Sequence, residues 1–139
     1  MFSSFVFDLY GLIFIFVFDY FSKNSQKDFF SIDYKITNLT DRMGMRLEGK
    51  VLKNIVSANI RSEGITKGAI QVPADGQPIV LLTDHPTIGG YPKIAVVISA
   101  DLDRIGQLIP GTTINFKEVS LEEAQNIFKA YNEDTNKYL

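Results

Sequence analysis

Residues 69–98 read AIQVPADGQPIVLLTDHPTIGGYPKIAVVI, and this stretch decides the fold class. It contains three apolar runs of the length typical of strands, at residues 69–72, 78–83 and 94–98. The first connection, at residues 73–76, is a turn candidate in which Gly76 can take a positive φ. The second connection, at residues 84–92, is rich in Gly and Pro. Because so few residues separate the runs, helical crossovers are excluded and antiparallel pairing is expected.

Further strand signals flank this stretch. Apolar residues alternate with polar ones at residues 34–37 and 45–48, as they do in half-buried strands, and another strand is predicted at residues 112–119. Together these segments predict a mainly β protein, with an antiparallel β-barrel as the architecture.

Two helices are predicted near the C-terminus. Ser99 is a candidate N-cap for a short one, which carries apolar residues on one face at Leu102, Ile105 and Leu108. The second begins at Leu121, because Ser120 and Glu123 form the S-x-x-E pattern of a capping box. The polar tail at residues 132–139 is expected to fray.

The N-terminal segment is strongly apolar and is treated separately. Its run at residues 9–18 is too short for a membrane-spanning helix, which needs about 20 residues. Residues 1–21 contain no Lys or Arg, so the basic start of a secretory signal is missing. We therefore expect no membrane association. Two interpretations stay open: an apolar strand, or a leader that is not native to the domain.

The composition limits the available chemistry. The net charge of -2 gives no indication of a basic stripe for nucleic acid. The absence of cysteine excludes disulfides, thiol catalysis and thiolate metal sites, and the single histidine, His85, excludes a site built from several imidazoles. No P-loop, dinucleotide fingerprint or nucleophile elbow is present. We expect no metal and no nucleic-acid partner, and ATP would have to be bound by another chain.

The loop at residues 84–92 is the strongest candidate for a binding site. Both flanking strands are apolar enough to belong to the core, so the ends of the loop are firmly held. Gly89 and Gly90 lack Cβ atoms and let a flat ligand approach the backbone, while Thr87 and Tyr91 add polar groups. A double glycine is also common in ordinary turns, and that interpretation stays open.

Three residues outside the loop complete the candidate set. The amide of Gln77 points into a cleft or belongs to a hairpin tip; Arg42 grips a carboxylate or closes a turn. Glu63 is a candidate acid or base. In a single hairpin Gln77 and the loop would lie about 17 Å apart, so the cleft follows the barrel face or Gln77 belongs to a separate, partner-facing surface. No catalytic residue is assigned; the predicted substrate-binding residues are Gln77, Thr87, Gly89, Gly90, Tyr91, Arg42 and Glu63.

Several short motifs, in this order, resemble one protein family. They are DRMGMRLEG at residues 41–49, SEG at 62–64, GAIQVP at 68–73, GQPI at 76–79, DHPTIGGYPK at 84–93 and ISADL at 98–102. The chain resembles the family that comprises the C subunit of 5-oxoprolinase, biotin-dependent carboxyltransferases and allophanate hydrolase subunit 2, over about residues 19–128. It departs from the family pattern where Pro86 and Ile88 replace residues that are often polar.

The resemblance implies a fold and a division of the chain. The fold would be a cyclophilin-like antiparallel β-barrel with two short helices. Residues 19–131 would form the C-terminal half of the family's domain, between an apolar leader at residues 1–18 and the polar tail at 132–139. We therefore expect the chain to be a truncated or split subunit.

The resemblance also implies an activity. Family members act with the A and B subunits of 5-oxoprolinase in the ATP-dependent opening of 5-oxoproline to glutamate, in the cytoplasm. ATP would be used by the complex, with no cofactor in this chain, which we expect to be inactive alone. In the related urea carboxylases the domain moves a carboxyl group from carboxybiotin to urea, and another relative antagonises a histidine-kinase inhibitor. The alternatives are a non-catalytic β-barrel that binds a partner similar to the B subunit, a urea carboxylase-type fragment, and a decayed gene product.

Overall fold

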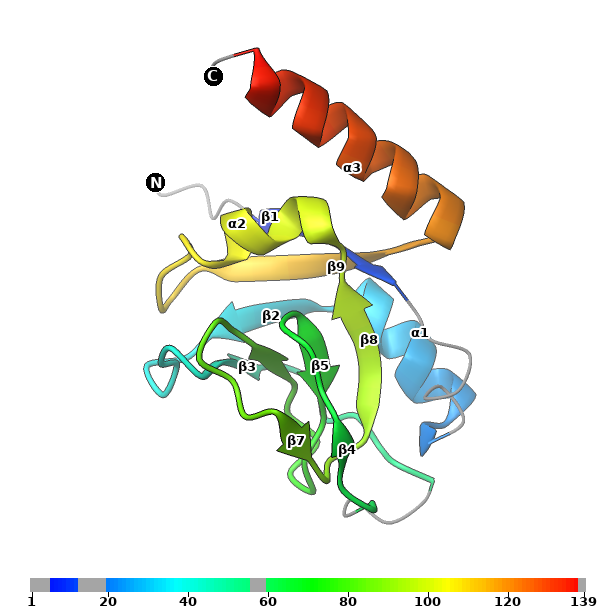
Figure 1. Ribbon diagram of the computed structural model, residues 1–139. Coiled ribbons are helices and arrows are strands. Elements are labelled where there is room, and N and C mark those ends of the chain that lie inside the picture. The colour runs from blue at the N-terminus through cyan, green and yellow to red at the C-terminus, as the bar shows by residue number, and fades with distance from the viewer. Residues whose placement is uncertain (1–5, 13–19, 56–59, 138–139) are drawn as a thin grey trace, which may run out of the picture.

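The computed structural model describes residues 6–12, 20–55 and 60–137, and its main body is a closed β-barrel (Figure 1). Around the barrel the strands follow the order β1, β8, β5, β6, β3, β2, β9. Strand β1 runs parallel to β9, and the other pairings between these strands are antiparallel, which confirms the predicted fold class. The barrel strands are β1 (Val6–Leu12), β2 (Asp33–Ile36), β3 (Gly44–Glu48), β5 (Ala69–Gln71), β6 (Ile79–Leu81), β8 (Lys93–Val97) and β9 (Thr113–Val119).

The barrel interior is filled with apolar side chains. In β2, buried Tyr34 and Ile36 alternate with exposed residues, as the period-two pattern requires. Phe116 of β9 stacks on Phe29 with ring centroids 4.7 Å apart. Burying each side chain of this size stabilises the fold by roughly 1.5–3 kcal/mol, so these contacts hold the barrel closed.

Helix α1 (Lys23–Ser31) packs against the barrel and supplies Phe29 to the core. The sequence analysis missed it, and the predicted number of helices is therefore wrong: the described residues contain three α-helices. The signal was weak because Phe29 and Phe30 are the only apolar residues in this polar segment. Its start is nevertheless well defined, since the Ser22 hydroxyl accepts a hydrogen bond from the Ser25 backbone N–H at 3.1 Å.

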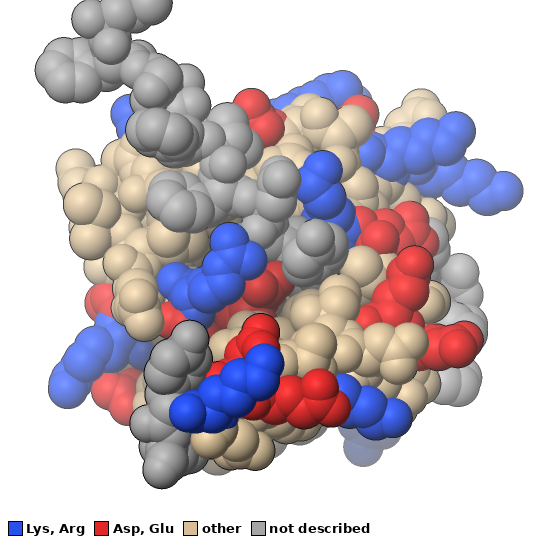
Figure 2. All heavy atoms as spheres, turned by 90° about the horizontal axis from the view of Figure 1, so that it is seen from above, with Lys and Arg blue, Asp and Glu red and all other residues tan. Residues whose placement is uncertain are grey.

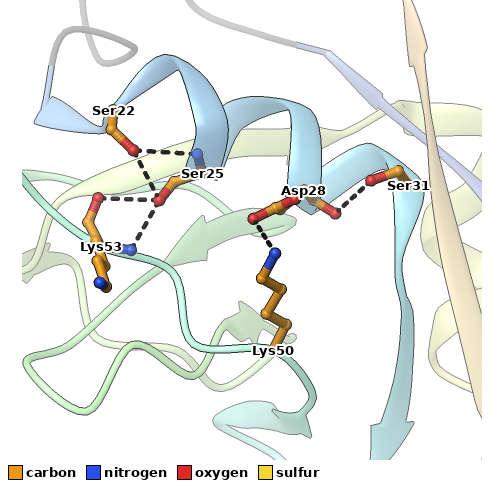
Figure 3. A network of polar contacts seen from close by, with 6 residues as sticks. All are labelled: Ser22, Ser25, Asp28, Ser31, Lys50 and Lys53. Atoms are coloured by element: carbon orange, nitrogen blue, oxygen red, sulfur yellow. Dashed lines mark hydrogen bonds and ion pairs between the residues drawn. The ribbon is translucent and has the colours of Figure 1, made fainter.

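Residues 49–53, which we call the docked segment, are tied to α1 (Figure 3). The Ser25 hydroxyl accepts from the Lys53 backbone N–H at 2.8 Å and donates to the Lys53 carbonyl at 3.1 Å. One helical turn further on, Asp28 pairs with Lys50 at 2.8 Å. The docked segment is thus held against α1 through its own backbone at Lys53 and through its side chain at Lys50.

Strand β5 lies between β6 and β8 and pairs antiparallel with both. This confirms the predicted antiparallel pairing but not a hairpin between the second and third apolar runs. Because β6 and β8 flank the same antiparallel neighbour, they run in the same direction. The connection at residues 84–92 must therefore cross from one end of the barrel to the other, and it does so without a helix.

The C-terminal elements match the prediction only in part. Ser99 starts a 3₁₀ turn, η2 (Ser99–Asp101), whose flanks show no side-chain cap, and α2 (Leu102–Ile105) is a single turn. The predicted Ser99 cap is therefore wrong. Helix α3 (Leu121–Asn136) does begin with the predicted capping box, in which Ser120 and Glu123 bond reciprocally at 3.1 and 2.7 Å. It extends through most of the predicted polar tail.

Part of the predicted leader belongs to the barrel. Strand β1 pairs with β9 over seven residues, from Val6 with Thr113 to Leu12 with Val119, as expected if this part is a strand. The rest of the segment up to Asp19 lies outside the described residues, and the domain boundary at residue 18 stays a prediction. Across residues 6–12, 20–55 and 60–137, no helix is both long enough and apolar enough to span a bilayer.

Candidate functional site

The crossing connection carries β7 (Ile88–Gly89), which pairs with β4 (Glu63–Gly64). We call these two short strands the ribbon. Two more backbone bonds extend it: the Ile65 N–H donates to the Thr87 carbonyl at 3.1 Å, and the Ile60 N–H donates to the Gly90 carbonyl at 2.8 Å. The ribbon is a sheet of its own, separate from the barrel's hydrogen bonds (Figure 1).

A small apolar cluster joins the ribbon to the outer face of the barrel. Ile65 follows β4 and packs with Ala69 of β5 and Leu81 of β6, with Ile79 partly buried beside them. Residues alternate between the two faces of a strand, so Ile70 points into the barrel core while Ala69 and Gln71 point outward beneath the ribbon. The polar side chain of Gln71 therefore shares this face with apolar residues.

Gln71 is the most unusual residue of this face. It is 6% exposed, and its side-chain nitrogen, Nε2, has no hydrogen-bond partner among the described residues. Gly89 lies directly above it: a Cβ at Gly89 would come within 2.6 Å of that nitrogen. Leaving a buried N–H unpaired costs about 1–3 kcal/mol, so this amide lowers the stability of the fold.

Lys93 is paired with Gln71 across a register shift in the β5–β8 ladder, and both side chains reach the ribbon: Lys93 contacts Glu63, and the Gln71 amide lies against Gly89. Its ammonium pairs with Glu63 of the ribbon at 2.9 Å and donates to the Gly64 carbonyl at 3.2 Å. The Lys93 side chain is 14% exposed, whereas that of Glu63 is 47% exposed. This pair is a polar link between the barrel and the ribbon.

The two glycines of the loop are closely approached by the protein itself. A Cβ on Gly89 would meet the Gln71 amide, and one on Gly90 would lie 3.1 Å from the Ile60 carbonyl. Gly89 thus allows the ribbon to pack closely on Gln71, and Gly90 allows the close approach of residues 60–62 within the ribbon's own pairing. Thr87 and Tyr91 are exposed. Of the predicted set, the structure brings these four residues and Glu63 together.

Arg42 lies at the opposite end of the connection. It pairs with Asp84 at 3.4 Å, and its side chain is 91% exposed. Neighbouring Asp41 accepts hydrogen bonds from the backbone N–H groups of Met43 and Gly44, which closes a turn. The contacts of Arg42 are those of a loop-closing pair at the start of the crossing.

Gln77 is engaged elsewhere. Its side-chain oxygen accepts from the Gly49 N–H at 2.9 Å, and its side-chain nitrogen donates to the Gly49 carbonyl at 3.0 Å. Both halves of its amide are therefore used to hold the docked segment. It also lines a groove of about 410 Å³ with Arg46 and Pro78, and residues 84–92 contribute nothing to the lining of that groove.

Sequence reasoning missed Gln71 and Lys93. The sequence places Gln71 in a short strand between apolar neighbours, so its side chain is expected to point outward. A polar side chain on an outer face open to solvent is common and gives no indication of a site. Only the crossing of the loop over β5 turns that face into a buried one. Lys93 follows Pro92 at the start of β8, and its partner Glu63 is remote in sequence.

No patch of one charge sign stands out on the face seen from above in Figure 2. Lys and Arg are interspersed with Asp and Glu on the face shown in Figure 2. Within the part of the chain that the structure describes, no group of three His, Asp or Glu side chains is placed to hold a metal ion. The ribbon and the face beneath it are thus the best candidate site.

The ribbon motifs lie within a region that matches a known family. The profile of the carboxyltransferase domain, subdomains A and B, matches residues 12–118. The chain belongs to this carboxyltransferase family. The resemblance found in the sequence motifs is thereby confirmed.

Two kinds of relative are similar to the chain in sequence. The chain is 42% identical over 104 residues to the C subunit of 5-oxoprolinase from Escherichia coli, covering 75% of this chain and 34% of that protein. It is 30% identical over 118 residues to urea amidolyase of Saccharomyces cerevisiae, covering 78% of this chain and 6% of that protein. Among solved structures, urea amidolyase from K. lactis matches with a TM-score of 0.87 and 26% identity, over 96% of this chain and 9% of that one. The chain thus spans about a third of the 5-oxoprolinase polypeptide that it resembles.

Proposed function

We propose that this chain serves as a subunit, or as one piece of a subunit, of an ATP-dependent 5-oxoprolinase. One observation carries the proposal. Identity reaches 42% with the C subunits of 5-oxoprolinase from Escherichia coli and Haemophilus influenzae, against 30% with the urea amidolyases. The family match at residues 12–118 also includes the ribbon and the face beneath it.

In this reaction, water cleaves the lactam C–N bond of 5-oxoproline. The ring carbonyl becomes the side-chain carboxylate of glutamate, and the ring nitrogen becomes its amine, while ATP is consumed. The sequence lacks a P-loop, so partners similar to the A and B subunits of 5-oxoprolinase would bind ATP. The contribution of this chain would be to bind and orient the small substrate at the ribbon.

The test is reconstitution. The purified chain is assayed for glutamate and phosphate release from 5-oxoproline and ATP in three mixtures. These are the chain alone, the chain with the A and B subunits, and the chain with the A and B subunits and the remaining two-thirds of a C subunit as a separate polypeptide. We expect activity only in the last mixture, because the chain spans a third of its relatives. Glutamate release by the chain alone would contradict the need for partners, and inactivity in every mixture would contradict the proposed function.

A urea carboxylase-type role is the second candidate. The structural match to urea amidolyase covers nearly the whole chain, with a TM-score of 0.87. In that role carboxybiotin, carried by another domain, would donate its carboxyl group to urea. The same reconstituted mixtures, supplied with urea and a carboxybiotinylated carrier, distinguish the two: urea-dependent loss of the carboxyl group favours this second role.

A further inference from the structure

We propose that Gln71 and Lys93 form a recognition subsite for a carboxylate, which the ribbon covers in this structure and which Glu63 occupies in place of the ligand. The subsite would take the carboxylate of a small organic acid. That this acid is 5-oxoproline rests on the proposed function; the subsite itself rests on the geometry beneath the ribbon.

The first support is the unpaired amide. Gln71 is only 6% exposed, yet its Nε2 donor has no partner in the described part of the chain. Two other described side-chain atoms share this state, the Tyr34 hydroxyl and Asn54 Oδ1. Tyr34 lies deep in the apolar core, where burial raises the pKa of its hydroxyl and Asp28 adds to the effect. Gln71 instead lies on the outside of the barrel, under two short strands.

The second support is the charge beside that amide. Lys93 is paired with Gln71 across a register shift in the β5–β8 ladder, and both side chains reach the ribbon, so an amide donor and an ammonium face it together. A carboxylate has two oxygens that accept hydrogen bonds, and charge-assisted bonds of this kind are about twice as strong as neutral ones. The pair therefore offers one donor for each oxygen of a carboxylate.

The third support is the present occupant. Glu63 places its own carboxylate 2.9 Å from the Lys93 ammonium. It leaves Nε2 of Gln71 unbonded, so only one of the two donors is satisfied. A substrate carboxylate that reached both donors would displace Glu63, which is 47% exposed and returns to solvent at little cost.

Access requires the ribbon to move, and its attachment is slight. Strands β4 and β7 are two residues each, and the apolar contact below them is the small cluster around Ile65. The position above the Gln71 amide is Gly89, which has no side chain to be pulled out of the core. Regions with few buried apolar contacts open at the lowest free-energy cost, so the ribbon is suited to be a cover.

The experiment uses the purified full chain and three probes: L-5-oxoproline, propionate, and 2-pyrrolidinone, a lactam without a carboxylate. Nuclear magnetic resonance follows the side-chain amide of Gln71 during titration. We expect both acids, but not 2-pyrrolidinone, to shift this resonance. Gln71→Leu and Lys93→Met should each weaken binding of both acids by roughly tenfold, the value expected for one charge-assisted hydrogen bond.

The substitution Glu63→Gln makes the sharpest distinction. It removes the charge of the internal competitor, so propionate should bind several-fold more tightly, whereas a merely structural ion pair predicts no gain. Gln125→Leu, an exposed position on α3, is the matched control and should bind like the parent chain. If Gln71→Leu fails to fold, the shift of the Gln71 amide in the parent chain decides.

The possible failures are separable. If neither acid shifts the Gln71 amide, or if folded Gln71→Leu binds both acids as the parent does, the subsite is wrong. If propionate binds as expected but no reconstituted mixture forms glutamate, the subsite stands and the proposed function is wrong. If glutamate forms and Gln71→Leu leaves the KM for 5-oxoproline unchanged, the function stands and the subsite is wrong.

Discussion

Two regions on the outside of the barrel, the docked segment and the ribbon, each lie against a glutamine side chain. The two glutamines differ in their hydrogen bonding. Gln77 uses both halves of its amide on the Gly49 backbone, and the Leu52 N–H donates to the Gly76 carbonyl at 3.0 Å. The ribbon covers Gln71 without bonding its Nε2 donor. The comparison teaches that a paired amide belongs to the architecture, whereas an unpaired buried donor next to a cation is available for a ligand.

The largest expected effect comes from adding a methyl group to one glycine at each region, at Gly76 and at Gly89. A Cβ at Gly76 would lie 2.8 Å from the Leu52 carbonyl, and φ there is +75°. Gly76→Ala should therefore destabilise the chain by about 3 kcal/mol, through backbone strain plus overpacking. Gly89→Ala, whose Cβ meets the flexible end of Gln71, should cost about 1 kcal/mol. Urea unfolding of both variants measures the difference.

Gly111 provides the control for strain alone. Its φ is +91°, but nothing lies within 4 Å of the position that a Cβ would take. Gly111→Ala should cost only the left-handed strain of about 1 kcal/mol. Equal losses for Gly76→Ala and Gly111→Ala would show that the docked segment yields easily and would remove the contrast with the ribbon.

The next effect tests the two hydrogen bonds by which Gln77 holds the docked segment. Gln77→Leu removes two hydrogen bonds and leaves the Gly49 N–H and carbonyl without these partners, so we expect a loss of about 2 kcal/mol in the free energy of unfolding. Propionate binding should be unchanged, because Gln77 holds the docked segment and lines a different groove. A variant that keeps parental stability but loses acid binding would mean that Gln77 serves the ligand after all.

These contrasts also show which features can be predicted from the sequence. The apolar runs around residues 69–98, the turn at Gly76 and the capping box at Ser120 are local features, and strands or helices follow from them directly. The motifs led to the family for the same reason. The site depends instead on a crossing: residues 84–92 pass over β5, and no local pattern says which strand lies between β6 and β8.

Helix α1 was missed for a related reason. Its stability comes from Phe29 in the barrel core and from two hydrogen bonds between the Ser25 hydroxyl and the Lys53 backbone, 28 positions apart in the chain. Gln71 shows the same limit, since Gly89 of the crossing connection lies against its side-chain amide. Such roles arise from contacts between remote segments, so composition and periodicity give no access to them.

The third effect should have the opposite sign to that of Gln77→Leu. Gln71→Leu keeps the approximate volume and removes an unpaired buried amide, so the chain should be about 1 kcal/mol more stable. The measurement is the midpoint of urea unfolding, with an unchanged slope as evidence of an unchanged fold. A clear loss of stability would show that the amide has a partner, such as a buried water, and would favour a structural role for it.

The smallest effect concerns the link between ribbon and barrel. Glu63→Gln removes one charge of the pair with Lys93, and because Glu63 is half-exposed we expect a loss of only about 0.5 kcal/mol. Added salt should narrow the gap between variant and parent, since it screens the charge pair. Asp134→Asn breaks a largely exposed pair with Lys137 at 3.2 Å and is the matched control, with no measurable loss. Hydrogen exchange then locates the effect: in Glu63→Gln the N–H of Ile65, bonded to the Thr87 carbonyl, should exchange faster, while that of Leu52 should not. Equal acceleration at both sites would mean that the two regions open together, which would contradict the ribbon as a separate cover.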